Sequence, residues 1–346
     1  MKLLNLFNTL LTKKQKFDFL LFFLIFFIGM LLELIGIGLV LPFLELLLNN
    51  DTYELYKNKL ASFNILIDSK SQLIVYSIFL LFSIYTLKAF FLTFVSFAQT
   101  KFLYNLKTNI SNKLFHIYLF KPFTFHLSNN SAFLIRNLND STHIMIIFRS
   151  ILTLITEILV VVGVIFLIIL LEPFTLSIAF FFGLIGFLFH KQVQTKASVW
   201  GEKRKFFEGK KMMNMQQSFS SIKEIKVFGR ENFFNKNFGF SNSFANSLEK
   251  KHDFVMSLPR IWFEWLTFVI IVSILFVMMN FGKGLNTIIP FLGLFAVAAY
   301  RIIPSLTRTM NSVQNIRYSY PAITPFIFEL GKNKSSDVLD MKQIEK

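Results

Sequence analysis

Long apolar runs, separated by shorter polar and charged stretches, dominate the pattern along this 346-residue chain. A helix needs about 20 apolar residues to cross the hydrocarbon core of a bilayer, and each run is close to that length or longer. We therefore predict an all-α membrane protein with six long transmembrane helices. The runs comprise residues 17–48, 72–98, 144–171, 173–189, 254–281 and 286–306.

The helical pattern continues beyond the apolar runs on one side of the membrane. No proline interrupts residues 131–171, and at about 1.5 Å per residue this segment is about 60 Å long, twice the hydrocarbon core. The same holds for residues 173–217 and 231–281. We expect these extensions to hold two connections, 120–130 and 219–230, about 25–30 Å from the membrane.

Composition and charge agree with a membrane protein. The chain is 54% hydrophobic, which is far above a soluble domain, and it has no cysteine, which excludes disulfide and thiol chemistry. Of its 36 Lys and Arg, only Lys57, Lys59, Lys70 and Lys283 fall in the loops 49–71 and 280–287. By the positive-inside rule, both termini and the other two connections are predicted to be cytoplasmic, with the chain in the inner membrane. The net charge of +16 thus follows topology and predicts no nucleic-acid partner.

One inner connection contains a short amphipathic motif, "SSIKEIKVFGREN", at residues 220–232. Ile222, Ile225 and Phe228 recur on one helical face, and Gly229 supplies a C-terminal stop. The pattern predicts a short helix across the tip of the extensions. Its apolar ridge either faces a soluble partner or packs on the chain's own helices.

This motif, extended to "SSIKEIKVFGRENFFNKNF", resembles the second coupling-helix region of six-helix (type IV) ABC exporters. The resemblance also covers "ELIGIGLVLPFLELL" and "KPFTFHLSNNSAFLIRNLND", and its order of elements spans residues 1–330. In that family, two short helices dock on nucleotide-binding domains and transmit ATP-driven closure, and the transporter works as a dimer. The resemblance implies a first coupling element at residues 123–128 and a second at 221–229. The implied coupling residues are Phe123, Phe125, Ile222, Glu224, Ile225, Phe228 and Gly229.

A phosphate-binding loop of the G-x-x-x-x-G-K-[ST] type is absent from the sequence. We therefore expect residues 1–330 to be a transmembrane domain without its nucleotide-binding domain, and residues 331–346 to be a polar linker or tail. The scattered histidines form no metal or catalytic pattern. ATP and Mg²⁺ would be bound by a fused or separate partner domain, and this chain alone is predicted not to be an enzyme.

Ionisable residues at membrane depth are costly and mark functional sites by default. The cationic candidates are Lys88, Arg260, Arg301 and Arg308. Arg301 and Arg308 lie seven residues apart, on nearly the same helical face and about 10 Å apart along the axis. A cavity lined by these side chains suits phosphate or pyrophosphate. The alternative is internal ion pairing with Glu33, Glu157 or Glu264.

Within the exporter family the chain is most similar to lipid-linked-oligosaccharide flippases, which use basic cavity residues to bind a pyrophosphate. The resemblance implies that Lys88, Arg260, Arg301 and Arg308 contact such a substrate. The predicted function is ATP-driven flipping of a lipid-linked oligosaccharide by alternating access. The alternatives are a peptide, lipid or drug exporter, and a non-transporting membrane scaffold.

The outer loop between the first two runs contains an amphipathic pattern. Tyr53, Tyr56, Leu60, Phe63 and Ile67 share one side of a helical wheel, with Asp51 or Thr52 as the predicted N-cap. The flippases have an external helix here that is thought to contact the polyprenyl tail, and the resemblance assigns that contact to Tyr53, Tyr56, Leu60 and Phe63. The other reading is an ordered loop that rests on the lipid headgroups.

Overall fold

The computed structural model describes residues 11–48, 50–61, 69–171, 176–280 and 285–344, and this part of the chain is helical without a strand. Its elements in chain order are α2 (Lys13–Gly38), α3 (Val40–Leu48), α4 (Asn50–Ala61), α5 (Lys70–Leu119), α6 (Phe123–Ser128), α7 (Ser131–Leu171), α8 (Leu176–Ser220), α9 (Ile222–Phe228), α10 (Glu231–Asn280) and α11 (Leu285–Ile344).

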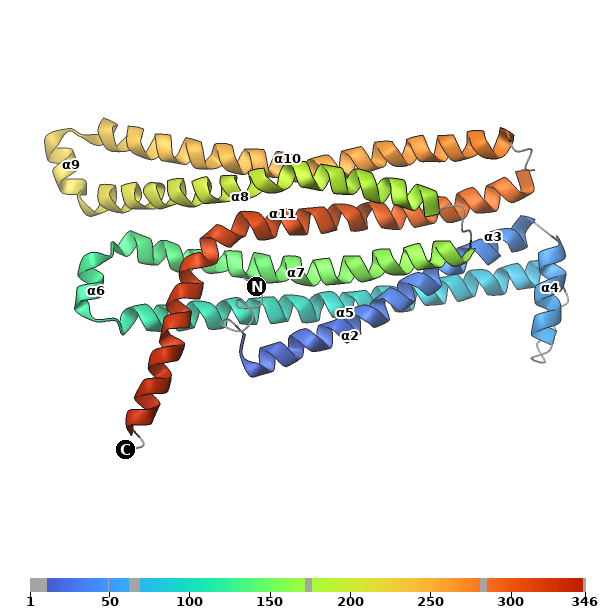
Figure 1. Cartoon of the computed structure of the whole chain (residues 1–346), viewed down its shortest axis with the longest axis horizontal. Helices are drawn as coiled ribbons and strands as arrows, with labels where there is room; N and C mark the ends of the chain where they lie inside the picture. Colours follow the sequence, from blue (N-terminus) through green and yellow to red (C-terminus); the bar gives the residue numbers. More distant parts are fainter. Residues whose placement is uncertain (1–10, 49, 62–68, 172–175, 281–284, 345–346) are drawn as a thin grey trace.

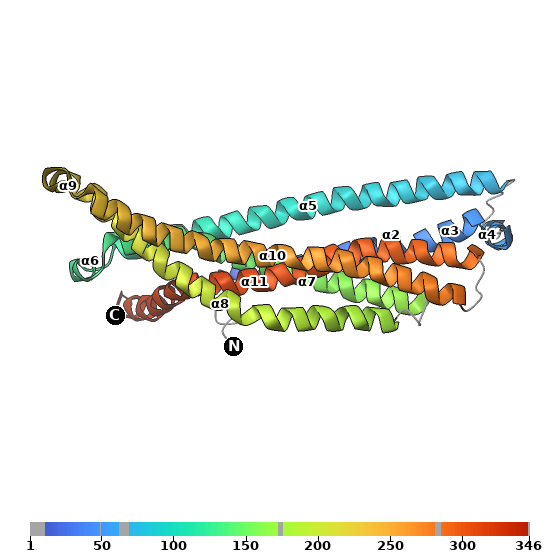
Figure 2. The same ribbon diagram turned by 90° about the horizontal axis from the view of Figure 1, so that it is seen from above.

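The long helices run up and down an elongated bundle (Figure 1). Both views place the short helices α6 and α9 at one end of the bundle and α4 at the other (Figures 1 and 2). Helix α11 packs mainly on α7, α8 pairs with α10, and α2 and α5 pack on α7. The two short connecting helices α6 and α9 therefore share one tip, as the sequence predicted.

Four helical segments are long and apolar enough to span a membrane, counted over the described residues: Lys13–Leu48, Lys70–Leu119, Ser131–Leu167 and Glu231–Asn280. This supports a membrane protein built from helices. The other two predicted spans, 173–189 and 286–306, include positions whose placement or side chains lie outside the described part of the chain. The number six therefore stays a prediction.

The lengths of α7 and α10 in the structure agree with the long helices expected from the sequence. Helix α7 has 41 residues and α10 has 50, so they are about 60 and 75 Å long at the α-helical rise. Only part of each can lie in the hydrocarbon core. Helices α6 and α9 lie at one end of these long helices (Figures 1 and 2).

The first apolar run is one helix in the prediction but two helices in the structure. Helix α2 ends at Gly38, Leu39 is a turn residue, and α3 begins at Val40. Pro42 has no N–H to donate to the carbonyl of Gly38, four residues earlier, so the hydrogen-bond ladder is interrupted there. The run is still one candidate membrane span, Lys13–Leu48, as predicted, but the break inside it was not predicted.

Local sequence signals explain several helix ends. Thr12 and Gln15 form a capping box at the start of α2: the Gln15 N–H donates to Thr12 Oγ1 at 3.3 Å, and the Thr12 N–H donates to Gln15 Oε1 at 3.0 Å. At the C-terminus of α9, the helix ends at Gly229, whose φ of 62° lies in the left-handed region that favours glycine. The predicted stop at Gly229 is confirmed.

Helix α11 bends in its C-terminal half (Figure 1). Pro321 and Pro325 lie in that half, and each removes a backbone N–H from the ladder, which is the usual cause of a kink. The helix continues through the predicted polar tail, 331–346, as far as Ile344.

Two of the three apolar clusters formed by the described residues lie along α2 and α7. The larger includes Phe26 of α2 and Leu152 of α7, and the smaller includes Ile37 of α2 and Val160 of α7. Along α2, Glu33 lies between the residues of the two clusters, and Glu157 does the same along α7. A buried polar layer therefore separates two apolar cores.

Candidate functional site: charged groups at membrane depth

Glu33 is the centre of the first group of charges. Its side chain is buried between α2, α5 and α11, with 4% of the residue exposed. Lys88 Nζ of α5 donates to Glu33 Oε1 at 3.0 Å, and Arg301 Nε of α11 lies 2.9 Å from the same oxygen. The Arg301 Nε–H makes no aligned hydrogen bond among the described residues, so this second contact is an ion pair only. One carboxylate thus holds two cations.

Glu157 of α7 is the centre of the second group. Arg308 Nε lies 2.5 Å from Glu157 Oε1, and the Ser305 hydroxyl donates to Glu157 Oε2 at 2.5 Å. Both partners come from α11, where Ser305 is fully buried and the Arg308 side chain is 46% exposed. Glu157 is therefore held by a hydroxyl on one oxygen and by a guanidinium on the other.

The predicted basic stripe of Arg301 and Arg308 lies on one side of α11, but each arginine contacts a different glutamate. Together with Lys88, the two groups contain three cations and two carboxylates. A formal excess of one positive charge remains in a layer with apolar clusters on both sides. We define these five side chains, Glu33, Lys88, Glu157, Arg301 and Arg308, as the membrane-level cluster.

Arg260 is not part of this cluster by any contact that the described residues show. Its Nε donates to Glu264 Oε1, one turn further along α10, at 2.8 Å, and both side chains are mostly exposed. The ion pair with Glu264 is the alternative that the sequence left open for this residue. Because the pair is formed within one helix and is exposed, it contributes little to stability.

Sequence reasoning missed two further groups, Tyr85 at the Glu33 site and Ser305 at the Glu157 site. Lys88 Nζ lies 5.1 Å from the ring centroid of Tyr85, which is a cation–π distance. The Tyr85 hydroxyl donates to the carbonyl of Gly36 in α2 at 3.4 Å. Ser305 was also missed, although it follows Arg301 by four residues and so shares its helical face. That spacing is the signal that could have found it.

The two tip helices present exposed aromatic and aliphatic side chains. Phe123 in α6 and Phe228 in α9 are 74% and 73% exposed, respectively. Their neighbours Phe125 and Ile225 are turned inward: Phe125 stacks on Tyr118, and Ile225 is 5% exposed. The predicted ridge of α9 is therefore divided, with Ile225 packed on the chain and Phe228 and half of Ile222 facing solvent.

Helix α4 confirms the helix predicted between the first two apolar runs but not its predicted N-cap. It begins at Asn50, so Asp51 and Thr52 lie in its first turn rather than at its N-cap. The start of a helix can differ from its predicted position by one or two residues, because any of several consecutive polar residues can act as the N-cap. Tyr53 and Tyr56 pack on the buried pair Leu46 and Leu73. Burial, with the Glu45 carboxylate nearby, raises the pKa of Tyr56.

Leu60 belongs to α4, whereas Phe63 and Ile67 lie outside the described residues. Tyr53 and Tyr56 contact the chain's own helices, as an ordered loop would. The proposed lipid-tail contact therefore rests on the position of α4 alone.

A second charged centre, which the sequence did not predict, lies in the extensions around Arg204 of α8. This side chain is 5% exposed. Its Nη1 donates to Glu208 Oε2 at 3.0 Å and lies 3.9 Å from Glu249 Oε1 of α10, and its Nη2 lies 2.9 Å from His143 Nε2 of α7. The guanidinium also stacks 5.0 Å from the ring centroid of Tyr318 of α11. We call this four-helix contact the Arg204 junction.

The protonation state of His143 follows from its partners. A guanidinium only donates, so His143 Nε2 accepts and Nδ1 carries the proton that it donates to Ser319 Oγ at 3.2 Å. The ring is therefore neutral, because its Nε2 carries no proton and accepts from Arg204.

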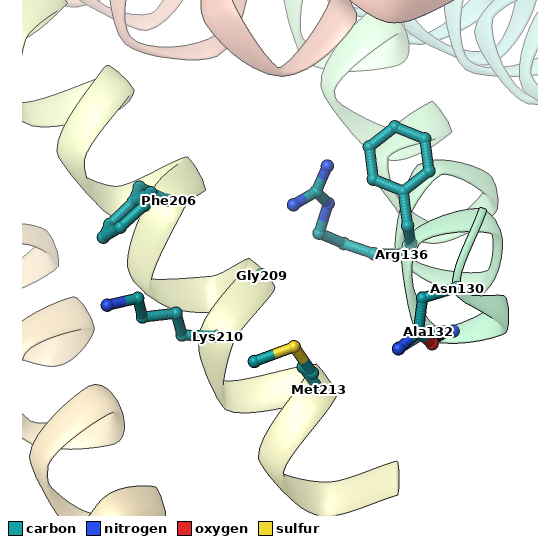
Figure 3. Close-up of a pocket in the computed structure, with 8 residues that line it drawn as sticks. Asn130, Ala132, Arg136, Phe206, Gly209, Lys210 and Met213 are labelled. Carbon is teal, nitrogen blue, oxygen red and sulfur yellow. Dashed lines mark hydrogen bonds between the residues drawn. The ribbon is translucent and has the colours of Figure 1, made fainter. Parts of the chain in front are cut away.

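A pocket of about 250 Å³ lies beside this junction, between α7 and α8 (Figure 3). Arg136 extends from α7 toward α8, and Lys210 extends along α8 away from Arg136 (Figure 3). Arg136 Nε lies 3.7 Å from Asp140 Oδ2, and its guanidinium is 5.0 Å from the Phe133 ring. Lys210 Nζ lies 4.6 Å from the Phe206 ring. Both cations are therefore engaged at the pocket wall, and the remaining lining is mostly apolar.

No protein-family model matches the chain. The resemblance to exporters stays a prediction that rests on the motifs quoted above.

Proposed function

We propose that this chain is the membrane-spanning half of an ATP-driven exporter that moves a lipid bearing an anionic pyrophosphate headgroup, such as a lipid-linked oligosaccharide. The observation that carries the proposal is the membrane-level cluster, in which three cations share two carboxylates. An isolated charge in a bilayer is costly, so an excess cation there indicates an anionic ligand. Guanidinium groups match phosphate oxygens particularly well.

The tip helices supply the second part of the proposal. Phe123 and Phe228 expose large apolar surfaces at the end of extensions that reach beyond the membrane. We propose that these two helices dock on a nucleotide-binding domain, which binds ATP and Mg²⁺, and that two copies of the chain form the transporter. Closure of the docked domains would shift the balance between inward-open and outward-open states.

A thermal-stability measurement tests the anion site. Farnesyl pyrophosphate is added to the purified chain, and binding to the folded state raises the unfolding midpoint by mass action. Wild type and Arg149→Ala, which alters an exposed arginine of α7, should both respond, and Arg301→Ala should not. An equal response of all three proteins would place binding elsewhere, and no response at saturating ligand would contradict the proposal.

Cysteine labelling tests the orientation, and the natural absence of cysteine makes it direct. An impermeant maleimide should label the Lys57→Cys thiol in intact cells and the Val227→Cys thiol only after permeabilisation. Labelling of the α9 position from outside would contradict the cytoplasmic placement of the tip and with it the docking proposal.

A specific observation favours one other function, that of a non-transporting membrane scaffold. Each of the four predicted substrate-binding cations has a carboxylate partner within the chain. Ion pairs alone satisfy a structural role. A chain whose unfolding midpoint does not respond to farnesyl pyrophosphate in the measurement above would fit this reading.

A further inference from the structure

The two glutamates of the membrane-level cluster occupy the cations that an anionic substrate would need. Glu33 Oε1 contacts Lys88 and Arg301 at 3.0 and 2.9 Å, and Glu157 Oε1 contacts Arg308 at 2.5 Å. A phosphate oxygen that bound these groups would take the place of the carboxylate oxygens. Substrate and glutamate therefore compete for the same donors.

The two glutamates differ in what else holds them. Glu157 accepts a short hydrogen bond from the buried Ser305 hydroxyl, which is independent of any cation. For Glu33, the structure shows polar contacts only with the two cations, among the described residues. Arg301 contributes an ion pair that is not an aligned hydrogen bond. Without its cations, Glu33 keeps no polar partner among the described residues, whereas Glu157 keeps the Ser305 hydroxyl.

We infer that Glu33 is a resident counter-ion of the anion site, which holds Lys88 and Arg301 in the empty protein and yields them to the pyrophosphate when substrate binds. Glu157, fixed by Ser305, stays in place and orients Arg308. This inference rests on the proposed function. It adds a residue that sets affinity and selectivity: monoanions that cannot displace Glu33 should bind weakly.

The charge balance supports the exchange. With Glu33 bound, the cluster has one excess positive charge, and release of Glu33 leaves two cations free for a pyrophosphate that carries several negative charges. The side chain of Lys88 is 16% exposed and that of Arg301 is 22% exposed, whereas that of Glu33 is 6% exposed. Lys88 and Arg301 are therefore more accessible to a ligand than the Glu33 carboxylate that pairs with them.

The test compares farnesyl pyrophosphate affinity in wild type, Glu33→Gln and Glu264→Gln, each reconstituted in lipid nanodiscs. Removing the competitor should tighten binding by about tenfold in Glu33→Gln, the effect of losing one close charge partner. Glu264→Gln removes a carboxylate that is paired within α10 and should bind like wild type.

The outcomes separate the inference from the proposed function. Equal affinity of wild type and Glu33→Gln, or weaker binding by Glu33→Gln, would overturn the counter-ion role while leaving the anion site intact. If neither protein binds, the proposed function fails as well, because Glu33→Gln exposes the cations most fully. The double variant Glu33→Gln/Lys88→Gln removes one charge of each sign, so it leaves no carboxylate unpaired that could cause misfolding. It should bind farnesyl pyrophosphate more tightly than Lys88→Gln alone.

Discussion

The membrane-level cluster and the Arg204 junction both bury arginine against carboxylate, yet their charge balance is opposite. In the cluster, three cations share two carboxylates and face an exposed edge at Arg308. In the junction, one arginine lies between Glu208 and Glu249 and also contacts a neutral histidine and a tyrosine ring. The membrane-level cluster therefore has more cations than carboxylates, whereas the Arg204 junction has more carboxylates than cations.

The comparison assigns different roles to the two sites: the Arg204 junction stabilises the packing of the helices, and the membrane-level cluster is the proposed ligand site. The Arg204 junction ties α7, α8, α10 and α11 together, with both terminal nitrogens of the guanidinium engaged. The membrane-level cluster links α2, α5, α7 and α11 through ion pairs, which an anionic substrate would replace under the proposed function. Mutations should therefore affect stability at the first site and ligand affinity at the second.

The largest effect is expected from Arg204→Met. Removing one partner of a buried ion pair costs about 3–5 kcal/mol when the other charge is left unpaired, and the partial exposure of Glu208 and Glu249 places this site near the lower end. The unfolding midpoint in detergent should fall by many degrees. Arg149→Met, at an exposed position of α7, is the control, and a similarly small change in both variants would contradict a structural role for the junction.

A second prediction concerns the close approach of α8 and α11 beside the junction. A Cβ at Gly201 would lie 2.4 Å from the backbone carbonyl oxygen of Tyr318, which cannot move without shifting α11. Gly201→Ala should therefore destabilise the chain by about 1–3 kcal/mol, the usual cost of overpacking.

Gly209→Ala is the matched control for Gly201→Ala. Its Cβ would meet Arg136 Nη1 at the same 2.4 Å, but this atom is the end of a flexible side chain. We expect a loss below about 1 kcal/mol. Thermal unfolding of the pair checks both, and an equal loss at the two positions would refute the close helix contact at Gly201.

The third prediction separates binding from stability at the membrane-level cluster. The Arg308 side chain is half-exposed but its partner Glu157 is buried, so Arg308→Gln should cost about 1–3 kcal/mol, because the carboxylate loses one partner and keeps the Ser305 hydroxyl. The affinity of this variant for farnesyl pyrophosphate should fall by about tenfold, because a charge-assisted contact is lost. A large fall in the midpoint with unchanged affinity would reverse the assignment of roles.

The smallest effect is expected at Gly239, on the extension of α10. No heavy atom lies within 4 Å of a Cβ built at this glycine, so an alanine fits without contact. Gly239→Ala should stabilise the helix by about 0.5–1 kcal/mol through its better helix propensity. A destabilisation measured by the same unfolding assay would show that this face is covered in the assembled protein.

Elements with a continuous pattern and a strong end signal could be predicted from the sequence. The span 131–171 and the stop at Gly229 agree with the structure because proline-free helical segments and a left-handed glycine are local properties. The break at Leu39 was missed because the apolar pattern of the run continues through Pro42. Hydropathy alone does not reveal a lost backbone donor.

The candidate site was predictable only in part. The ionisable residues at membrane depth were found because charge is rare in apolar runs, and ion pairing with glutamate was one of the two readings. Which cation meets which carboxylate depends on how α2, α5, α7 and α11 pack, which the sequence does not specify. Arg204 was missed for the opposite reason: it lies among many charged residues of an extension, where nothing distinguishes a buried arginine from a solvated one.

The most direct measurement compares the affinity of the reconstituted chain for farnesyl pyrophosphate with that for farnesol, which has the same tail without the charge. The account predicts that wild type prefers the pyrophosphate by at least about tenfold and that Arg301→Gln/Arg308→Gln loses this preference. Equal affinity of wild type for the two ligands would contradict an anion site in the membrane-level cluster.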